Sequence, residues 1–211
     1  MKTFGKFLTE AKDQGATFTF GRFNPPTTGH EKLVKKLQSV GKGTDVLLFS
    51  SHSNDKRKNP LSHKDKVKYL RKFFGRIVVD ANVRTVFEIC NFLQEKKYVN
   101  INMVVGSDRV KEFEMLITKY NGVKARHGFY KFKNINIISA GERDPDADDV
   151  SGMSASKMRE FAEKGDFEGF KDGVPSKGKN LAKKLYDDIR KGMGINEGTL
   201  PQYMIEDLIT E

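Results

Sequence analysis

The residues best suited to chemistry lie in one short segment, residues 21–30, with the sequence GRFNPPTTGH. A β-prone run, residues 16–20, precedes it, and a run with helical apolar spacing, residues 31–38, follows it. Gly21 and Gly29 let the backbone turn and approach a ligand, and the N-terminus of a helix attracts anions. With His30 in the first helical turn, the segment indicates a phosphate site. A tight strand–helix connection with a surface histidine fits the same residues.

A second segment, residues 153–159 (MSASKMR), opens another helix-prone stretch. Ser154 is a suitable N-cap, Ser156 lies close to the helix start, and Arg159 can reach an anion at that end. An ordinary capped helix would carry the same residue types.

Charge is unevenly distributed along the chain of 211 residues. There are 38 Lys and Arg against 28 Asp and Glu, a net charge of +10, and the excess peaks in residues 55–76. A positive field of this kind favours an anionic partner, either nucleic acid or a polyphosphate. The basic run Lys56-Arg57-Lys58 either binds a phosphorylated acceptor or forms a solvated loop. The acidic residues 142–149 form either a mobile flap or a carboxylate contact to Mg²⁺ through water.

Several classes of protein are excluded by composition. The single cysteine, Cys90, rules out an internal disulfide framework and fits a reducing compartment. No apolar run approaches the ~18 residues that cross a bilayer, so we expect no membrane association and a cytoplasmic location. The four histidines show no zinc-ligand spacing with Cys90, and a P-loop sequence is absent.

Strand-like and helix-like runs must position these groups. The sequence predicts strands at residues 16–20, 45–50, 77–79, 101–105 and 135–138, and helices at 31–38, 62–74, 84–96 and 109–117. Such alternation favours an α/β fold, a Rossmann-like, doubly wound parallel sheet with a C-terminal helical section. We expect residues 1–150 to form the core and residues 151–211 to complete the nucleotide site with helices broken at Gly165, 173–175 and 192–198.

The two segments together resemble the nucleotidylyltransferase superfamily. Thr27-Thr28-Gly29-His30 is similar to its (H/T)-x-G-H motif, and residues 21–25 are similar to the start found in nicotinamide-mononucleotide adenylyltransferases. Residues 153–159 resemble the superfamily's I-S-x-T-x-(I/V)-R element, with Met153 in place of Ile and Ser156 in place of Thr. Gly106 and Asp108 are similar to a strand-end G-x-D that lines the nucleotide pocket, although Asp108 also fits a helix N-cap. The resemblance covers about residues 16–160.

This resemblance implies transfer of AMP from ATP to a phosphorylated small-molecule acceptor, with nicotinamide mononucleotide as the leading candidate, Mg²⁺ as cofactor and pyrophosphate as product. The residues it implies are, for catalysis, His30, Thr27 and Arg159; for the nucleotide, Gly21, Arg22, Phe23, Asn24, Gly29, His30, Gly106, Asp108, Ser154, Ser156 and Arg159; and for the acceptor, Lys56 and Arg57.

Two alternatives stay open. One is a cytidylyltransferase that uses CTP and a phosphorylated alcohol or sugar. The other is a non-catalytic protein that binds a nucleotide or nucleic acid, although the sequence shows no aromatic-plus-basic stacking pattern that favours nucleic acid. A homo-oligomer is compatible with either function.

Overall fold

The computed structural model describes residues 14–141 and 153–195. Its contacts divide the chain into two compact units, and both units take residues from separate stretches of the sequence. The first unit contains the described residues of 14–20, 35–49 and 81–141, and the second contains those of 21–34, 50–80 and 153–195. The predicted division at residue 150 stays a prediction.

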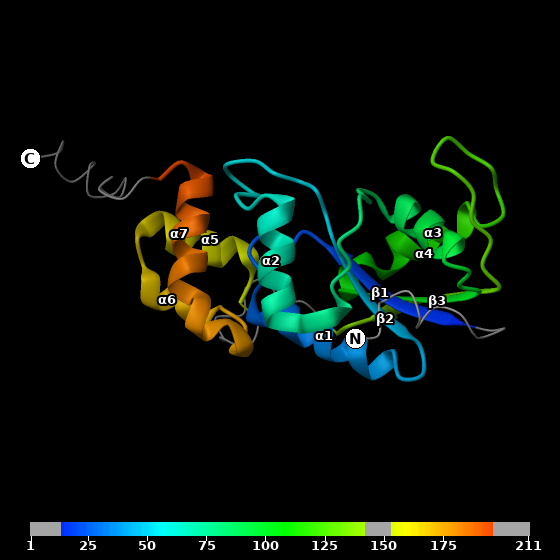
Figure 1. The fold of residues 1–211 in the computed structure, drawn as a ribbon, viewed down its shortest axis with the longest axis horizontal. Helices are drawn as coiled ribbons and strands as arrows, with labels where there is room; N and C mark the ends of the chain where they lie inside the picture. The colour runs from blue at the N-terminus through cyan, green and yellow to red at the C-terminus, as the bar shows by residue number, and fades with distance from the viewer. Residues whose placement is uncertain (1–13, 142–152, 196–211) are drawn as a thin grey trace, which may run out of the picture. The chain divides into compact units, whose positions relative to one another are not determined.

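The first unit is built on a four-stranded parallel sheet (Figure 1). Its strands are β1 (Gly15–Gly21), β2 (Asp45–Ser50), β3 (Asn100–Val105) and β4 (Asn134–Ser139), in the order β2-β1-β3-β4. Phe18 pairs with Met103 across β1 and β3, and Val105 pairs with Ser139 across β3 and β4. Because β2 and β3 lie on opposite sides of β1, the order changes direction there, as in a Rossmann-like sheet.

Two helices of the first unit follow the predicted pattern. They are α3 (Val86–Glu95) and α4 (Val110–Lys119), and a 3₁₀ turn, η3 (Ser107–Arg109), precedes α4. Thr85 caps α3 by accepting a hydrogen bond from the amide of Glu88, and the aromatic rings of Phe18, Phe49 and Phe92 pack edge to face. These contacts pack apolar residues of β1 and β2 against α3, as the alternation of strand-like and helix-like runs predicts.

The prediction of a strand at residues 77–79 is wrong. Gly75–Ile77 form a 3₁₀ turn, η2, and the described four-stranded sheet has no strand in this stretch. Gly75 has a φ of 75°, which turns the chain out of the preceding helix, and Val78 is buried. The short β-branched run is therefore a buried connection here. Composition alone cannot distinguish such a connection from a strand.

The second unit is mostly helical. It contains α2 (His63–Phe74), α5 (Ala155–Lys164), α6 (Phe167–Asp172), the 3₁₀ turn η5 (Ser176–Leu181) and α7 (Ala182–Met193). The helix α1 (Thr28–Val40) begins in this unit and ends in the first. Ser62 caps α2 as predicted, and the predicted breaks at Gly165 and Gly173 are confirmed as helix ends. The third predicted break, residues 192–198, is confirmed as well, because α7 ends at Met193 and Gly194 is its left-handed C-cap.

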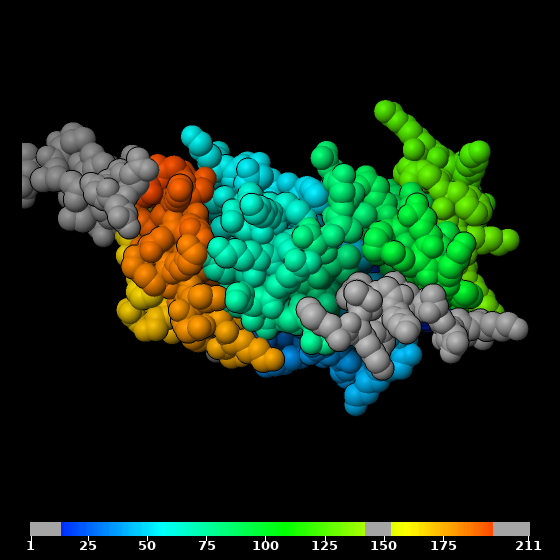
Figure 2. Space-filling model, viewed as in Figure 1, coloured from blue at the N-terminus to red at the C-terminus, as the bar shows by residue number. Residues whose placement is uncertain are grey.

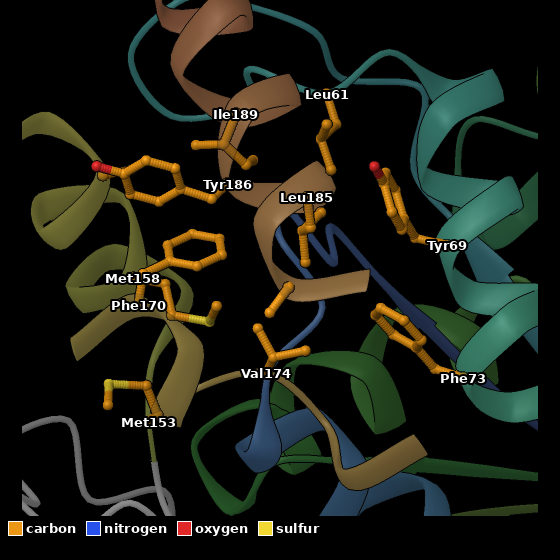
Figure 3. Packing of buried hydrophobic residues seen from close by; sticks show 12 residues of the cluster. Leu61, Tyr69, Phe73, Met153, Met158, Phe170, Val174, Leu185, Tyr186 and Ile189 are labelled. Atoms are coloured by element: carbon orange, nitrogen blue, oxygen red, sulfur yellow. The ribbon is translucent and has the colours of Figure 1, made fainter. Parts of the chain in front are cut away.

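A single apolar cluster holds these helices together (Figure 3). Tyr69 and Phe73 of α2 face Leu185 of α7, and Met158 of α5 and Phe170 of α6 close the other side, all at most 2% exposed. The hydroxyl of Tyr69 donates a hydrogen bond of 2.5 Å to the carboxylate of α7's Asp188. Figure 2 shows α2 and α7 packed side by side at the surface. The predicted C-terminal helical section thus shares one core with α2.

Candidate active site

The connection from β1 to α1 is shaped by a close approach of Phe23 to Gly21. A Cβ on Gly21 would lie 3.0 Å from the Phe23 ring, so a larger residue at this position would press on the ring. Phe23 has a φ of 47° and is buried, and a side chain in this left-handed region costs about 1–2 kcal/mol. The amide of Ser51 donates to the carbonyl of Gly21 at 2.9 Å. The loop is therefore held in one defined conformation.

Asn24 fixes this loop to the chain before α2. Its side-chain amide donates to the carbonyl of Leu61 at 3.0 Å, and its side-chain oxygen accepts from the amide of Leu61 at 2.9 Å. Both ends of the buried side chain are used in this way. These bonds shape the loop, and the predicted contact of Asn24 with the nucleotide stays a prediction.

His30 and Thr27 form a hydrogen-bonded pair at the start of α1. The backbone amide of Thr27 donates to Nδ1 of His30 at 3.0 Å, and the Thr27 hydroxyl lies 3.0 Å from the same nitrogen. A nitrogen that accepts from an amide carries no proton, so the ring proton lies on Nε2, which is a donor. The Phe23 ring packs on the imidazole with a centroid distance of 4.8 Å. Orientation and tautomer are thus both set by the protein.

Fewer backbone amides at the start of α1 are left to bind an anion than the sequence suggests. The amide of Thr28 donates to the carbonyl of Gly173, and those of His30 and Glu31 donate to Thr27. Within residues 14–141 and 153–195, the amide of Gly29 has no such acceptor. A phosphate at this helix end would therefore meet the Gly29 amide and the His30 ring.

The second segment converges on the first through Arg159. Ser154 caps α5 by accepting from the amide of Lys157, as predicted. One guanidinium nitrogen of Arg159 donates to the carbonyl of Asn24 at 2.7 Å, and the other donates to the hydroxyl of Ser156 at 3.2 Å. Two segments that are 135 residues apart are thereby joined by one side chain.

Positive charge accumulates around Arg159. Burial lowers the pKa of its guanidinium, and the charge of Arg22 lowers it further, whereas Asp55 raises it. In the described part of the chain, no ion pair with a carboxylate involves Arg159. The guanidinium groups of Arg22 and Arg159 repel one another, and hydrogen bonds hold that of Arg159 in place. A bound anion that neutralises both charges is therefore favoured.

The basic run after β2 is ordered by Asp55. One carboxylate oxygen of Asp55 accepts from the amides of Arg57 and Lys58 at 3.0 and 2.6 Å, and the other accepts from the Asn59 side chain at 2.5 Å. These bonds lower the pKa of Asp55 to about 2. Lys56, Arg57 and Lys58 therefore project from a closed turn and are exposed, as a solvated loop would have them, and their binding of an acceptor stays a prediction.

This turn and α5 enclose a groove of about 370 Å³. Its walls carry Lys56, Arg57, Lys58 and Arg159 together with the hydroxyl-bearing Ser156 and the carboxylates of Glu160 and Glu163. The predicted acceptor residues thus line the same groove as Ser156 and Arg159, whereas Thr27 and His30 are not among its lining residues. Its charge and volume suit a phosphorylated small molecule or a pyrophosphate group.

Gly106 and Asp108 belong to the first unit, after β3. The carboxylate of Asp108 folds back over Gly106, where an added Cβ would lie 2.6 Å from it. Asp108 lies inside η3, and the N-cap of α4 is Arg109, so the alternative of a capping role is wrong. Its predicted nucleotide contact stays a prediction.

A buried lysine that the sequence analysis did not identify lies against the chain after β2. Lys66 of α2 is fully buried, and its ammonium donates to the carbonyls of Ser51 and Ser53 at 2.5 and 3.0 Å. Burial lowers its pKa to about 8. Nearby, the rings of His52 and His63 stack at 3.7 Å, and burial followed by the charge of His52 lowers the pKa of His63. A lysine inside an amphipathic helix normally indicates a solvated face, so no sequence signal marks it.

Metal ligands are not clustered in the described residues. No group of three or more His, Cys, Asp or Glu side chains there could hold a metal ion. The acidic stretch of residues 142–149, for which a flap or a Mg²⁺ contact was predicted, lies outside the described residues. None of the described helices is both long enough and apolar enough to cross a membrane.

Comparison with known proteins agrees with the geometry of the two segments. The family model described as cytidylyltransferase-like matches residues 18–161, which include both segments and the sheet between them. No curated protein matches the chain. This match covers more than half of the sequence and supports a nucleotidyltransferase activity in general. The chain belongs to the cytidylyltransferase-like family of the nucleotidylyltransferase superfamily.

Proposed function

We propose that this protein transfers AMP from ATP to a phosphorylated small molecule and releases pyrophosphate, with nicotinamide mononucleotide as the leading acceptor. The observation that carries the proposal is the hydrogen bond of 2.7 Å from Arg159 to the carbonyl of Asn24. It brings the cation of the second motif to the loop that carries Thr27 and His30. Adenylyl transfer is favoured because both motifs are most similar to those of adenylyltransferases.

The reaction needs no covalent intermediate with the protein. An oxygen of the acceptor phosphate attacks the α-phosphorus of the nucleotide, the bond from that phosphorus to the bridging oxygen breaks, and pyrophosphate leaves with the bonding electrons. The protein then acts by positioning the reactants and by stabilising charge.

Each part of the site has a role in this step. The Nε2–H of His30 and the amide of Gly29 donate to oxygens of the α-phosphate, where negative charge develops. Thr27 keeps Nδ1 of His30 occupied and so keeps the proton on Nε2. Arg159, with Ser156 beside it, holds the departing pyrophosphate, and Lys56 and Arg57 hold the acceptor phosphate.

The available charge is sufficient for this role. Two unit charges 4 Å apart near a protein surface interact by about 4 kcal/mol before desolvation is counted. The groove carries four cationic side chains, from Lys56 to Lys58 and at Arg159, against the two carboxylates of Glu160 and Glu163. A bound polyphosphate would therefore be attracted rather than repelled.

Mg²⁺ would enter as the complex of the nucleotide. The described residues offer hydroxyls, amides and cations around the groove but no cluster of carboxylates, which fits a metal ion carried by the phosphates rather than by a resident protein site. Its contribution when bound is to neutralise phosphate charge.

Cytidylyl transfer from CTP is the second candidate, because the matching family model is described as cytidylyltransferase-like. A panel measurement separates the two candidates: pyrophosphate release from ATP and from CTP, each with Mg²⁺, against a set of phosphorylated acceptors that includes nicotinamide mononucleotide. Release with ATP and one acceptor supports the proposal, and release with CTP alone replaces it by the second candidate. If calorimetry detects binding of neither nucleotide, both candidates fail.

A further inference from the structure

A hairpin-like excursion connects α4 to β4 in the first unit, over residues 120–133 (Figure 1, light green). At its base, the amide of Gly122 donates to the carbonyl of Tyr130 at 2.8 Å, and the side chain of Asn121 bonds both the amide and the carbonyl of Phe132. At its tip, Ala125 and Gly128 exchange two backbone hydrogen bonds of 3.1 and 3.0 Å. The excursion is thus a closed, hydrogen-bonded structure.

Aromatic side chains fix the inner face of this hairpin. The ring of His127 stacks on Phe87 of α3 at 4.2 Å and meets Tyr120 edge-on at 4.7 Å. Tyr130 is fully buried, and its hydroxyl donates to the carbonyl of Ile117 at 2.9 Å. The side chains that point outward are therefore presented from a rigid base.

The outer face carries an exposed aromatic ring in line with two cations. Burial alternates along the returning arm, where Tyr130 and Phe132 are buried while Phe129, Lys131 and Lys133 are exposed. Phe129 is 47% exposed, which is unusual for a large apolar residue in a described structure with few others.

No negative side chain offsets the charge of this stretch. Between Glu114 and Glu142 the sequence contains five basic residues and no Asp or Glu. The five are Lys119, Lys124, Arg126, Lys131 and Lys133, all exposed, and Figure 2 shows side chains of this segment projecting outward. The charge of this stretch is therefore +5, which favours an anionic partner.

We propose that residues 119–133 bind single-stranded nucleic acid. The lysines and Arg126 contact backbone phosphates, and the Phe129 ring stacks on a base, which is the combination that sequence-tolerant single-strand binding uses. Stacking needs only an exposed ring, whereas a stable protein partner needs about 800 Å² of complementary surface per side and a membrane needs a broad apolar face. This function is separate from nucleotidyl transfer and uses none of its residues.

The test is fluorescence anisotropy of a labelled 12-nucleotide single strand of mixed sequence with the full chain, measured over a range of salt concentrations. Each phosphate contact on a single strand contributes about −0.7 to the slope of log affinity against log salt, so Lys131→Ala/Lys133→Ala should reduce the slope by about 1.4. Phe129→Ala should weaken binding about fivefold to a hundredfold, and Phe129→Tyr should retain it. All of these side chains are exposed, and circular dichroism checks the fold.

The matched control is Lys64→Ala/Lys68→Ala, which removes two exposed charges from α2. Binding by this control within twofold of wild type supports the proposal. The proposal is overturned if wild type fails to bind at low salt, if the control weakens binding as much as the hairpin double variant, or if excess ATP displaces the strand. Equal binding of a poly-glutamate peptide or of phosphatidylserine vesicles would also overturn it.

Discussion

His30→Asn is the substitution that isolates the proposed catalytic donor. In the wild type, Nδ1 of His30 accepts from the backbone amide of Thr27 at 3.0 Å, and the proton therefore lies on Nε2. The side-chain oxygen of asparagine can occupy the position of Nδ1 and accept the same hydrogen bond. Nothing in asparagine reaches the position of Nε2. The variant therefore keeps the hydrogen bond to the Thr27 amide and loses the donor that faces the substrate, together with the ring that packs on Phe23.

The expected magnitude follows from this separation. Loss of one preorganised donor to transition-state charge costs about 10²–10³ in rate, so kcat should fall by that factor. The free energy of unfolding should stay within about 1 kcal/mol of wild type, because the Thr27 amide remains paired. His30→Ala should lower kcat as much as His30→Asn does. It should also lower the free energy of unfolding by about 1–3 kcal/mol more, since it leaves the Thr27 amide without its acceptor.

The assay is pyrophosphate release with the productive pair of nucleotide and acceptor, combined with urea unfolding of each variant. His30→Gln serves as the control, because its amide N–H can reach the position of Nε2 and should restore part of the rate. A folded His30→Asn variant that keeps kcat within threefold of wild type would refute the role of Nε2, and so would equal losses in His30→Asn and His30→Gln.

Three further predictions concern charge and packing in the second unit. Arg159→Lys should raise KM for the nucleotide at least tenfold, because lysine lacks the planar two-nitrogen fork with which Arg159 spans the Asn24 carbonyl and the Ser156 hydroxyl; an unchanged KM in steady-state kinetics would contradict this. Lys66 has a pKa of about 8 in the fold and 10.5 ordinarily, so between these pH values the unfolded chain binds the proton and the folded chain does not. Stability contributed by this group therefore rises with pH across that window, by up to about 3 kcal/mol, and the rise should vanish in Lys66→Met; parallel urea-unfolding curves for the two proteins from pH 7.5 to 10.5 would contradict it. Gly192→Ala should lower the free energy of unfolding by about 1–3 kcal/mol, since its Cβ would overlap the Pro60 carbonyl. An unchanged thermal unfolding temperature would contradict this, because it would mean that the neighbouring chain moves aside at no cost.

The sequence was most informative where one local signal fixes one local structure. The strands at β1, β2, β3 and β4, the caps at Ser62 and Ser154, and the helix ends at Gly165 and Gly173 all follow from nearest-neighbour chemistry. The resemblance to the superfamily implied that both segments serve one nucleotide site, but nothing in the sequence indicated the hydrogen bond from Arg159 to the carbonyl of Asn24.

Long-range pairing explains most of what the sequence missed. No residue near Asn24 in the sequence indicates that Leu61 is the partner of its side-chain amide. The pattern of α2 predicts a solvent-exposed Lys66, whereas the structure buries it. The failed strand at residues 77–79 has the same origin, because burial by a neighbouring element and burial in a sheet select the same residue types.

The outer face of the hairpin was missed for a different reason. Counted over the whole chain, the basic excess lies in the first 80 residues, because acidic residues elsewhere cancel the charge of residues 119–133. The alternation of Phe129, Lys131 and Lys133 with buried Tyr130 and Phe132 becomes informative only when burial is known. Local charge and local exposure together identify the surface, and either alone does not.

The central claim is that the bond to the α-phosphorus of a nucleoside triphosphate is the one exchanged at the His30 and Arg159 site. The most direct measurement incubates the protein and an acceptor with ATP or CTP labelled either at the α-phosphorus or at the γ-phosphorus and follows the label. We predict that the α-label appears in the acceptor product while the γ-label appears only in pyrophosphate. Transfer of the γ-label to the acceptor, or release of both labels as hydrolysis products with no labelled acceptor, would contradict the account.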